Sequence, residues 1–333
     1  MDLRKTTVLI ALLGALLLVL AACGATPTVQ IPVSEDYPNA QLLVTTGWLA
    51  EHLGDDSLRI VDMRAPGQYQ AGHVPGAVNV PVGDIAGTVN GIPFEFDQGQ
   101  IQDTLNRVGL TTDMTVVIYD DLGMMNSSRF FWTLDYVGHS DARVLNGGWD
   151  AWSAEGRETT QRAPNVQATE YPIELQPSKL IDASQVLARL DDPEVVIVDA
   201  RSPEEYTGEV QLADRGGHIP GAVNLVWLDA LTGGDAVFTI NSDWQEQLQD
   251  SDVEVFKPAE EIQAVLSNRG ITPGEQAITY CQTLWRGAHV YFLLRLMGFE
   301  DVTGYDGSWA EWGNRPDLPV VTGPDPGSLE TAD

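Results

Sequence analysis

Hydrophobic positions along the chain alternate between short β-branched runs and longer stretches with a helical spacing. The short runs are typical of buried parallel strands, and they occupy residues 58–61, 115–119, 195–198 and 277–280. The longer stretches predict helices at residues 100–108, 128–137, 258–269 and 286–297, the third of which begins with a proline. Strands that alternate with helices predict an α/β fold, in which helices flank both faces of a parallel sheet.

The landmarks of the first half of the chain return in the second half in the same order. The first set is Asp62-Met63-Arg64, Tyr69 and Gly-His-Val-Pro-Gly-Ala-Val-Asn at residues 72–79. The second set is Asp199-Ala200-Arg201, Tyr206 and Gly-His-Ile-Pro-Gly-Ala-Val-Asn at residues 217–224. Because the copies lie too far apart for a solenoid, the repeat predicts two tandem domains of one fold.

Proline-rich stretches indicate the boundaries of these domains. A linker is predicted at residues 156–180, between an N-terminal domain at 41–155 and a C-terminal domain at 181–315. Residues 316–333 are rich in proline, glycine and acidic side chains, and they predict a flexible tail.

The first residues have the layout of an export signal. Arg4 and Lys5 precede an uncharged apolar run at residues 6–20, which is shorter than the roughly 20 residues of a membrane span. The ending Leu20-Ala21-Ala22-Cys23 resembles the bacterial lipoprotein box, which implies a signal peptide at 1–22 and lipidation of Cys23. Residues 23–40 then predict an extended tether, and the body is expected on the extracytoplasmic side of a bacterial membrane. An ordinary signal peptide, in which Cys23 is incidental, is the alternative.

The charge of the chain excludes several classes of partner. The 333 residues carry 18 Lys+Arg against 48 Asp+Glu, a formal net charge of -30 at pH 7. This balance argues against nucleic acid and against polybasic adhesion to anionic lipid. Any site for an anion must therefore be built from a few local arginines and backbone amides. The five histidines do not have metal-ligand spacing, so no metal is expected.

Cys281 is the single thiol of the predicted folded body, so it has no partner for an intramolecular disulfide. It is either a small buried hydrophobe or a reactive nucleophile. Its place after a strand and before a helix favours the thiolate, because loop amides and the positive helix end stabilise negative charge there. The matched position in the first half holds Asp120.

These landmarks, together with Tyr280-Cys281 and Tyr305-Asp306-Gly307-Ser308-Trp309, resemble the two-domain rhodanese family of thiosulfate and mercaptopyruvate sulfurtransferases. The resemblance implies two tandem rhodanese-like domains, of which the first lacks the cysteine and is catalytically inactive. It further implies that sulfur passes from thiosulfate to Cys281 and then, as a persulfide, to cyanide or a thiol by double displacement. No cofactor is implied. Alternatives are 3-mercaptopyruvate as the donor and a non-catalytic binding module.

The spacing of Cys281 and Arg286 distinguishes two related chemistries. Four residues separate them and define a six-residue loop, whereas related phosphatases have a loop one residue longer, whose arginine would stand at Gly287. The shorter loop favours sulfur transfer over hydrolysis of phosphate esters.

The expected substrate-binding residues are Gln282, Thr283, Leu284, Trp285 and Arg286 of this loop, with Arg215 and Arg201. Leu284 departs from the family, which commonly has glycine at the fourth loop position. If the backbone there is left-handed, Leu284 costs about 1 kcal/mol. Asp199, Arg201 and Glu205 are expected to form an ion-pair cluster beneath the loop, and Asp306 is a candidate to approach it.

Overall fold

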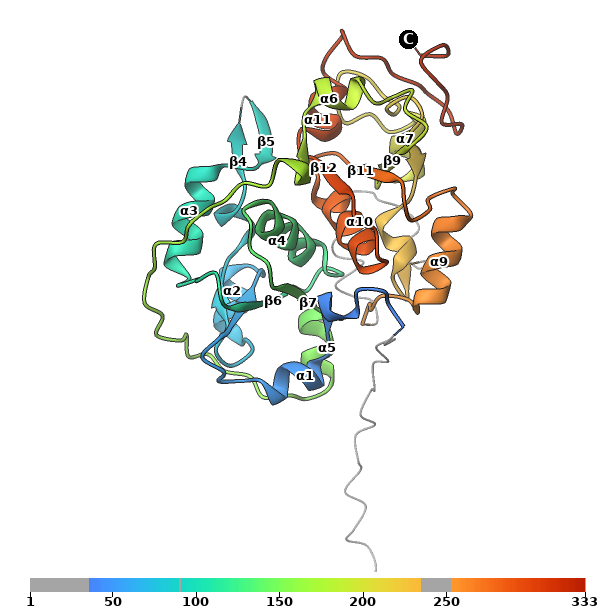
Figure 1. Cartoon of the computed structure of the whole chain (residues 1–333). Coiled ribbons are helices and arrows are strands. Elements are labelled where there is room, and N and C mark those ends of the chain that lie inside the picture. The colour runs from blue at the N-terminus through green and yellow to red at the C-terminus, as the bar shows by residue number, and fades with distance from the viewer. Residues whose placement is uncertain (1–35, 90, 235–252, 333) are drawn as a thin grey trace, which may run out of the picture. The chain divides into compact units, whose positions relative to one another are not determined.

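The structure, a computed structural model, describes residues 36–89, 91–234 and 253–332 (Figure 1). The predicted signal peptide, Cys23 and most of the predicted tether lie outside the described residues. In the part that is described, no helix is both long and apolar enough to cross a membrane.

Two five-stranded parallel sheets form the framework. The first sheet has the order β1-β7-β6-β2-β3, and the second has the order β10-β9-β11-β12-β8. Read from opposite ends, the two orders match strand for strand, which confirms the tandem α/β prediction. The strands of the first sheet are β1 (Leu43–Val44), β2 (Leu58–Asp62), β3 (Val78–Asn79), β6 (Thr115–Tyr119) and β7 (Ala142–Leu145). Those of the second are β8 (Leu180–Ile181), β9 (Val195–Asp199), β10 (Val223–Asn224), β11 (Gln276–Tyr280) and β12 (Val302–Tyr305).

Helices connect the strands on both faces of the sheets (Figure 1). In the first half they are α1 (Thr46–Glu51), α2 (Pro66–Ala71), α3 (Gln98–Arg107), α4 (Met125–Tyr136) and α5 (Gly148–Ala154). In the second half they are α6 (Ala183–Leu187), α7 (Pro203–Thr207), α9 (Ala259–Ser267), α10 (Trp285–Leu296) and α11 (Ser308–Trp312). Short 3-10 turns are η1 (Ala40–Leu42), η2 (Val82–Asp84), η3 (Pro177–Lys179) and η4 (Trp227–Ala230).

Local sequence explains where several helices begin. The side chain of Asp97 accepts a hydrogen bond from the amide of Gln100 and caps α3. Ser202 and Glu205 form a reciprocal capping box at α7, in which each side chain accepts from the other's amide. Pro258 caps α9, so the predicted proline start lies one residue outside the helix.

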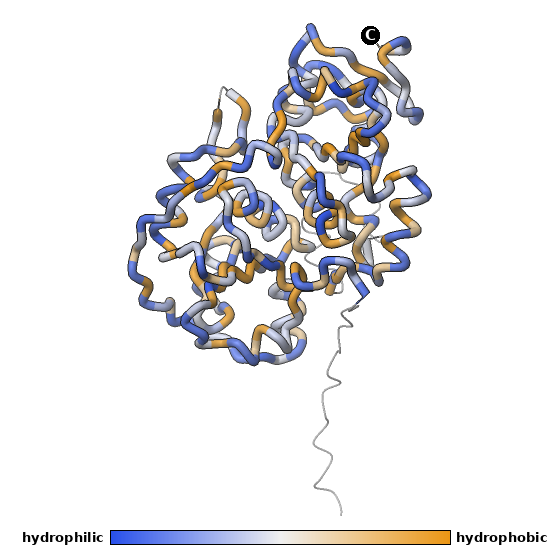
Figure 2. Tube along the Cα trace, viewed as in Figure 1, coloured by the Kyte–Doolittle hydropathy of each residue, from blue (hydrophilic) through white to orange (hydrophobic). Residues whose placement is uncertain are grey.

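Helices α4 and α10 pack against each other and join the two domains. Residues of both contribute to one apolar cluster, in which the rings of Phe131 and Phe292 meet edge-on at 4.9 Å. Along the same contact, Tyr291 donates a 2.5 Å hydrogen bond to Asp135. Apolar stretches gather along the inner segments of each domain, and hydrophilic stretches prevail along the outer connections (Figure 2).

An antiparallel hairpin, β4 (Gly87–Val89) with β5 (Ile92–Glu95), extends from the first domain. Its two short strands were not predicted from the hydrophobic pattern. The hairpin is relevant to function because its end, Glu95-Phe96, lies near the loop that follows β12.

The structure differs from the sequence prediction at both ends of the folded body. Tyr37, assigned to the tether, is 4% exposed and donates a 2.5 Å hydrogen bond to the carbonyl of Lys257. Within the predicted flexible tail, Leu318 and Val321 are buried, and the amide of His218 donates to the carbonyl of Val321 at 2.8 Å. Apolar side chains inside proline-rich segments anchor both segments to the core.

Candidate active site: the loop after β11

The loop of residues 281–286, called the active loop below, connects β11 to α10. Cys281 directly follows the strand, and Leu284 is the N-cap of the helix. Leu284 has φ 61° and ψ -1°, so its backbone is left-handed, as expected for a position where the family has glycine. This conformation costs a non-glycine residue roughly 1–2 kcal/mol. The loop keeps the left-handed turn, and the side chain of Leu284 is buried beneath it.

The hydroxyl of Ser308 holds two amides of the active loop. Its oxygen accepts hydrogen bonds from the N–H of Leu284 at 3.0 Å and from the N–H of Cys281 at 3.4 Å. The hydroxyl donates to the carbonyl of Tyr305 at 2.7 Å, so its one donor and two acceptor sites are all used. Ser308 is fully buried and itself has a left-handed backbone, with φ 50°.

The first domain has glycine at the position that matches Ser308. Gly148 has φ 54°, and a Cβ atom there would collide with the carbonyl oxygen of Asp120. In the second domain, a serine occupies this strained place, and its hydroxyl bonds the active loop. Sequence reasoning missed Ser308, although the two copies differ visibly as Gly-Gly-Trp and Gly-Ser-Trp.

The start of α11 holds the carbonyls of the same loop. Trp309 N–H donates to the carbonyl of Cys281 at 3.0 Å, and Ala310 N–H donates to that of Gln282 at 2.9 Å. The side chain of Gln282 donates to the carbonyl of Leu212 at 3.1 Å. The first half of the active loop is therefore fixed by two separate segments of the second domain, the start of α11 and the chain at Leu212.

Cys281 is 1% exposed and belongs to the apolar cluster that also contains Leu284 and Trp285. Among the described residues, no hydrogen bond reaches its Sγ atom, and the amides of Cys281 and Leu284 donate to Ser308. The expectation that these amides converge on the sulfur is therefore wrong for Cys281 and Leu284. The sulfur lies at the base of the loop with an apolar lining.

The matched loop of the first domain holds a carboxyl group. Asp120 accepts hydrogen bonds from the amides of Leu122 (2.7 Å), Met124 (3.1 Å) and Ser127 (2.6 Å), and from the Ser127 hydroxyl (2.6 Å). Burial raises the pKa of Asp120, and these donors oppose that rise. Met124 caps α4 with φ 63°, as Leu284 caps α10. The strand–loop–helix unit of this fold can therefore surround an acidic group with amides.

Arg286, the last residue of the active loop, forms a bidentate ion pair with Glu205 of α7, at 2.5 and 2.8 Å. Burial lowers the pKa of Arg286, but Glu205 and the nearby Cys281 thiolate more than offset this, so the pKa is raised overall. Burial raises the pKa of Glu205, and Arg286 outweighs that effect and lowers it. The Arg286 guanidinium therefore lies close to both Glu205 and Cys281.

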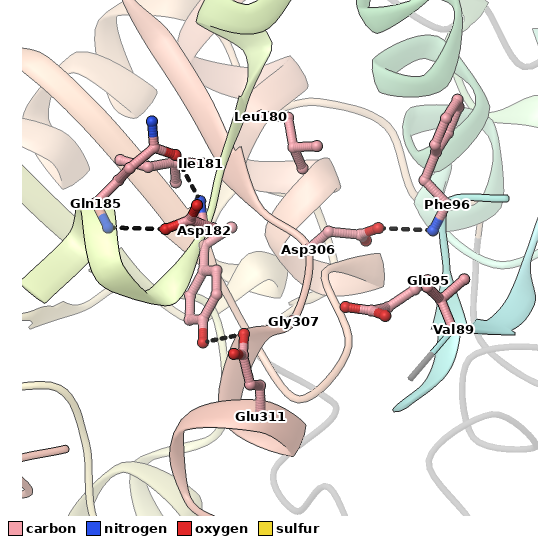
Figure 3. Close-up of a pocket in the computed structure, with 11 residues that line it drawn as sticks. Val89, Glu95, Phe96, Leu180, Ile181, Asp182, Gln185, Asp306, Gly307 and Glu311 are labelled. Carbon is pink, nitrogen blue, oxygen red and sulfur yellow. Dashed lines mark hydrogen bonds between the residues drawn. The ribbon is translucent and has the colours of Figure 1, made fainter. Parts of the chain in front are cut away.

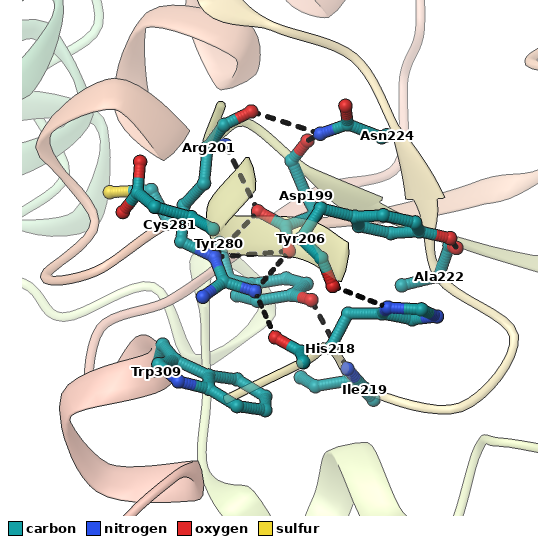
Figure 4. Close-up of polar contacts among 12 residues, drawn as sticks. Asp199, Arg201, Tyr206, His218, Ile219, Ala222, Asn224, Tyr280, Cys281 and Trp309 are labelled. Carbon is teal, nitrogen blue, oxygen red and sulfur yellow. Dashed lines mark hydrogen bonds and ion pairs between the residues drawn. The ribbon is translucent and has the colours of Figure 1, made fainter. Parts of the chain in front are cut away.

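The expected ion-pair cluster beneath the loop is built differently from the prediction. Arg201 pairs with Asp199 at 2.6 Å, donates to the Gly217 carbonyl at 2.7 Å and stacks on the Trp309 ring at 4.5 Å (Figure 4). Glu205 forms its ion pair with Arg286, and it also lies close enough to Arg201 for each charge to shift the pKa of the other in favour of the ionised form. Because Arg201 is 1% exposed and its Nε and Nη2 donors are in use, its placement is that of a structural residue.

Arg215 does not supply charge to the active loop. Its guanidinium donates to four main-chain carbonyls, those of Trp312, Gly313, Arg315 and Leu318, at 2.5 to 3.4 Å. The expectation of a substrate-binding role for Arg215 came from its neighbourhood in sequence, and the structure uses it to fix the segment after α11 instead. Thr283 and Gln282, in contrast, remain half-buried at the loop itself.

Asp306 lies next to the active site and bonds to the first domain. Its carboxylate accepts from Arg129 of α4 at 2.6 Å and from the amide of Phe96 at 2.7 Å. The Arg129 guanidinium also lies over the Trp285 ring, 5.4 Å from its centroid. The first domain therefore contacts both the active loop and the segment that holds it.

A cavity of about 280 Å³ lies beside Asp306-Gly307, between the β4–β5 hairpin and the second domain (Figure 3). Its lining includes the carboxyl groups of Glu95, Asp182, Asp306 and Glu311. Burial, and then the charges of Asp306 and Glu311, raise the pKa of Glu95 to about 7. Within the described ranges, no group of three or more His, Cys, Asp or Glu side chains is arranged to hold a metal ion.

The fold and this loop define a tandem α/β protein with one thiol at the end of a central parallel strand. A family model described as Rhodanese-like domain matches residues 45–155 and 182–315. The chain therefore belongs to the rhodanese family, and it is a sulfurtransferase.

Individual relatives match over most of their length. The thiosulfate sulfurtransferase of Corynebacterium glutamicum is 33% identical over 315 residues, which are 90% of this chain and 96% of that protein. The thiosulfate sulfurtransferase of Azotobacter vinelandii is 34% identical over 290 residues, covering 86% and 99%. The crystal structure of YnjE matches with a TM-score of 0.74 at 26% identity, over 88% of this chain and 71% of that one.

Proposed function

We propose that this sulfurtransferase takes sulfane sulfur from thiosulfate, holds it as a persulfide on Cys281 and passes it to cyanide or a thiol. The observation that carries the proposal is the place of Cys281, which ends a central parallel strand and opens the loop before α10. Thiosulfate as the donor is supported by the names of the relatives from Corynebacterium glutamicum and Azotobacter vinelandii.

The transfer proceeds as two displacements at sulfur. The Cys281 thiolate attacks the outer sulfur of thiosulfate, the S–S bond of thiosulfate breaks, and its electron pair leaves with sulfite. Cyanide then takes the outer sulfur of the persulfide as thiocyanate, and the Cys281 thiolate is restored. Because the sulfur travels on the cysteine itself, the reaction needs no metal or organic cofactor.

Two features of the active loop support Cys281 as the nucleophile. The positive end of α10 lies directly after the active loop, and Arg286, paired with Glu205, lies close to Cys281. The matched loop of the first domain, with a carboxyl group bonded by three amides, is a precedent within the same chain.

Thiocyanate formation from thiosulfate and cyanide tests this proposal. The wild-type chain should form thiocyanate, and Cys281→Ser should reduce the rate to the uncatalysed level. The matched control is Asp120→Ser, which alters the equivalent position of the first domain. Thiocyanate formation that survives Cys281→Ser would remove the mechanism.

Two further functions have an observation in their favour. The uncharged Gln282 and Thr283 favour 3-mercaptopyruvate as an alternative donor, which the same assay compares directly with thiosulfate. The 1% exposure of Cys281 favours a non-catalytic binding module, for which neither donor would yield product.

The first domain is proposed to be catalytically inactive, because Asp120 replaces the cysteine and its carboxyl group already occupies the loop amides. Its contribution is the contact that α4 makes with α10 and with Asp306.

We further propose that the protein is exported and anchored through a lipid on Cys23, with the enzyme outside the cytoplasmic membrane. The Leu20-Ala21-Ala22-Cys23 pattern supports this proposal. Expression in bacteria with labelled fatty acid should give a labelled membrane-bound protein, and Cys23→Ser should give unlabelled protein in the soluble fraction. Equal labelling of both forms would contradict the anchor.

A further inference from the structure

The active loop contributes one cation, Arg286, and that cation is paired. Its Nη1 and Nη2 atoms bond both carboxylate oxygens of Glu205, and the two side chains are only 10% and 2% exposed. A buried bidentate pair presents a nearly neutral unit to a molecule that approaches Cys281. The positive charge of Arg286, which would attract a dianionic donor, is therefore largely cancelled by Glu205.

Other arginines around the site are also engaged. Arg201 pairs with Asp199, and Arg129 pairs with Asp306, each at 2.6 Å. Arg215 donates to main-chain carbonyls. Each of these guanidinium groups has its charge or its donors committed elsewhere in the described part of the chain.

Other parts of the chain do not add the positive charge that these paired arginines lack. Residues 235–252 contain no lysine or arginine and five acidic residues. The cavity beside Asp306-Gly307 is lined by carboxyl groups, among them Glu95 and Glu311. With a formal net charge of -30, the protein repels a dianion more strongly than a monoanion.

The first domain shows the same positions without the ion pair. Gln68 stands where Glu205 stands, and Asn126 stands where Arg286 stands when residues are counted from the helix N-caps Met124 and Leu284. The side chains of both Gln68 and Glu205 accept a 3.1 Å hydrogen bond from the backbone N–H three residues earlier. Because a neutral amide serves this capping role in the first domain, capping does not require the charge of Glu205.

We propose that Glu205 is a specificity-determining residue: by neutralising Arg286, it makes Cys281 prefer sulfane donors with one negative charge or none over dianionic thiosulfate. The favoured class comprises organic thiosulfonates and persulfides. This inference rests on the proposed sulfur transfer to Cys281 and concerns which donor supplies it. Neutralisation of Arg286 weakens the binding of dianionic thiosulfate more than that of a donor with one negative charge. The site would therefore select donors by their charge rather than by their shape.

Methanethiosulfonate is a suitable probe because it differs from thiosulfate by a methyl group in place of one oxyanion. The Cys281 thiolate attacks its outer sulfur, the S–S bond breaks, and the electron pair leaves with methanesulfinate. One Cys281 persulfide anion forms from either donor, so both reactions give the same enzyme product. The ratio of kcat/KM for the two donors therefore reports on recognition of the donor and its leaving group.

The test compares this ratio in the full chain and in Glu205→Gln. The wild-type protein should favour methanethiosulfonate, and Glu205→Gln should raise kcat/KM for thiosulfate relative to methanethiosulfonate by about tenfold. Rising ionic strength should reduce that gain, because the freed charge of Arg286 is screened. The substitution copies Gln68 and keeps the capping acceptor.

Two variants keep the test decisive if Glu205→Gln does not fold. Arg286→Asn leaves the carboxylate of Glu205 unpaired and should shift the ratio further toward methanethiosulfonate. The double variant Glu205→Gln/Arg286→Asn copies the first domain and should return the ratio to within about threefold of wild type. A ratio that stays constant in folded Glu205→Gln, or in folded Arg286→Asn, would overturn the role of Glu205.

Failure of this inference is distinct from failure of the proposed function. If neither donor adds sulfur to Cys281 in the wild-type chain, the proposed function fails and the inference with it. If both donors add sulfur and the ratio of their kcat/KM values is the same in wild type and in Glu205→Gln, only the inference fails.

Discussion

The Ser308 hydroxyl accepts a 3.0 Å hydrogen bond from the amide of Leu284, and both residues have left-handed backbones, with φ of 50° and 61°. Such conformations persist for non-glycine residues when surrounding contacts outweigh their cost. Here each strained residue contributes to the contact that holds the other. The active loop is thus defined by two adjacent strained positions, one in the loop and one in the segment that braces it.

Replacement of Ser308 by glycine should slow sulfur loading although it relieves backbone strain. Glycine fits φ 50° without cost, as Gly148 does in the first domain, but it leaves the amides of Cys281 and Leu284 without their acceptor. We expect the rate constant for persulfide formation to fall about tenfold or more. Stopped-flow fluorescence after addition of thiosulfate measures this rate.

Ser308→Ala is the control, because it removes the hydroxyl and keeps the strain. Similar loading rates in Ser308→Gly and Ser308→Ala would assign the effect to the hydroxyl. An unchanged rate in both variants would show that the hydroxyl does not position the loop.

At Leu284, glycine should give a more stable protein than alanine. Both substitutions lose a buried side chain, which costs about 2–5 kcal/mol, but only glycine removes the left-handed strain of roughly 1 kcal/mol. Urea unfolding of Leu284→Gly and Leu284→Ala measures the difference. At Leu293, a buried position within α10, the order should reverse, because glycine is less stable than alanine inside a helix.

Breaking the ion pair between Arg129 and Asp306 should destabilise the two-domain body. The side chains are 0% and 8% exposed, so removal of one partner leaves a buried charge that costs about 3–5 kcal/mol. Arg129→Met and Asp306→Asn should each lower the free energy of unfolding, and the double variant should cost less than the sum. Additive effects in this double-mutant cycle would mean that the pair contributes no coupling.

Glu95 should make the stability of the fold depend on pH. Its pKa is raised from 4.5 to about 7 in the folded chain, so its protonated form is favoured by folding. Its contribution is fully present below about pH 4.5 and is lost as pH rises through about 7. Relative to Glu95→Gln, the wild-type protein should therefore lose stability between these values and change no further above them. Thermal unfolding across this range checks the sign, and a difference independent of pH would contradict it.

Features that depend on local sequence were predictable, because the forces that set them act over a few residues. The runs of β-branched residues gave β6 (Thr115–Tyr119) without error and β11 (Gln276–Tyr280) to within one residue. The repeated order of landmarks gave two copies of one sheet topology. The left-handed backbone considered for Leu284 came from the resemblance to a family with glycine at that position, and Leu284 has φ 61°.

Contacts between distant segments were not predictable from the pattern. Glu205 was grouped with Asp199 and Arg201, its neighbours in sequence, yet it pairs with Arg286, 81 residues away. The Ser308 hydroxyl reaches Leu284 across 24 residues. Such partners are chosen by the packing of α7, α10 and α11 around the sheet, which hydrophobic periodicity does not encode.

The roles of Arg215 and Tyr37 were also wrongly predicted, because the prediction used only the sequence around them. Arg215 looked available for substrate because a motif follows it, but nearby carbonyls after α11 use its donors. Tyr37 lies in a stretch whose prolines suggested a tether, yet its buried ring and the hydrogen bonds of Asn39 anchor that stretch to the second domain. Composition describes the average tendency of a segment, whereas a single buried side chain decides whether it packs.

The most direct measurement is the intact mass of the protein after thiosulfate, and again after cyanide. The wild-type chain should gain one sulfur atom with thiosulfate and lose it with cyanide, and Cys281→Ser should gain none. A wild-type mass that does not change, or a sulfur that is gained equally by Cys281→Ser, would contradict the persulfide on Cys281.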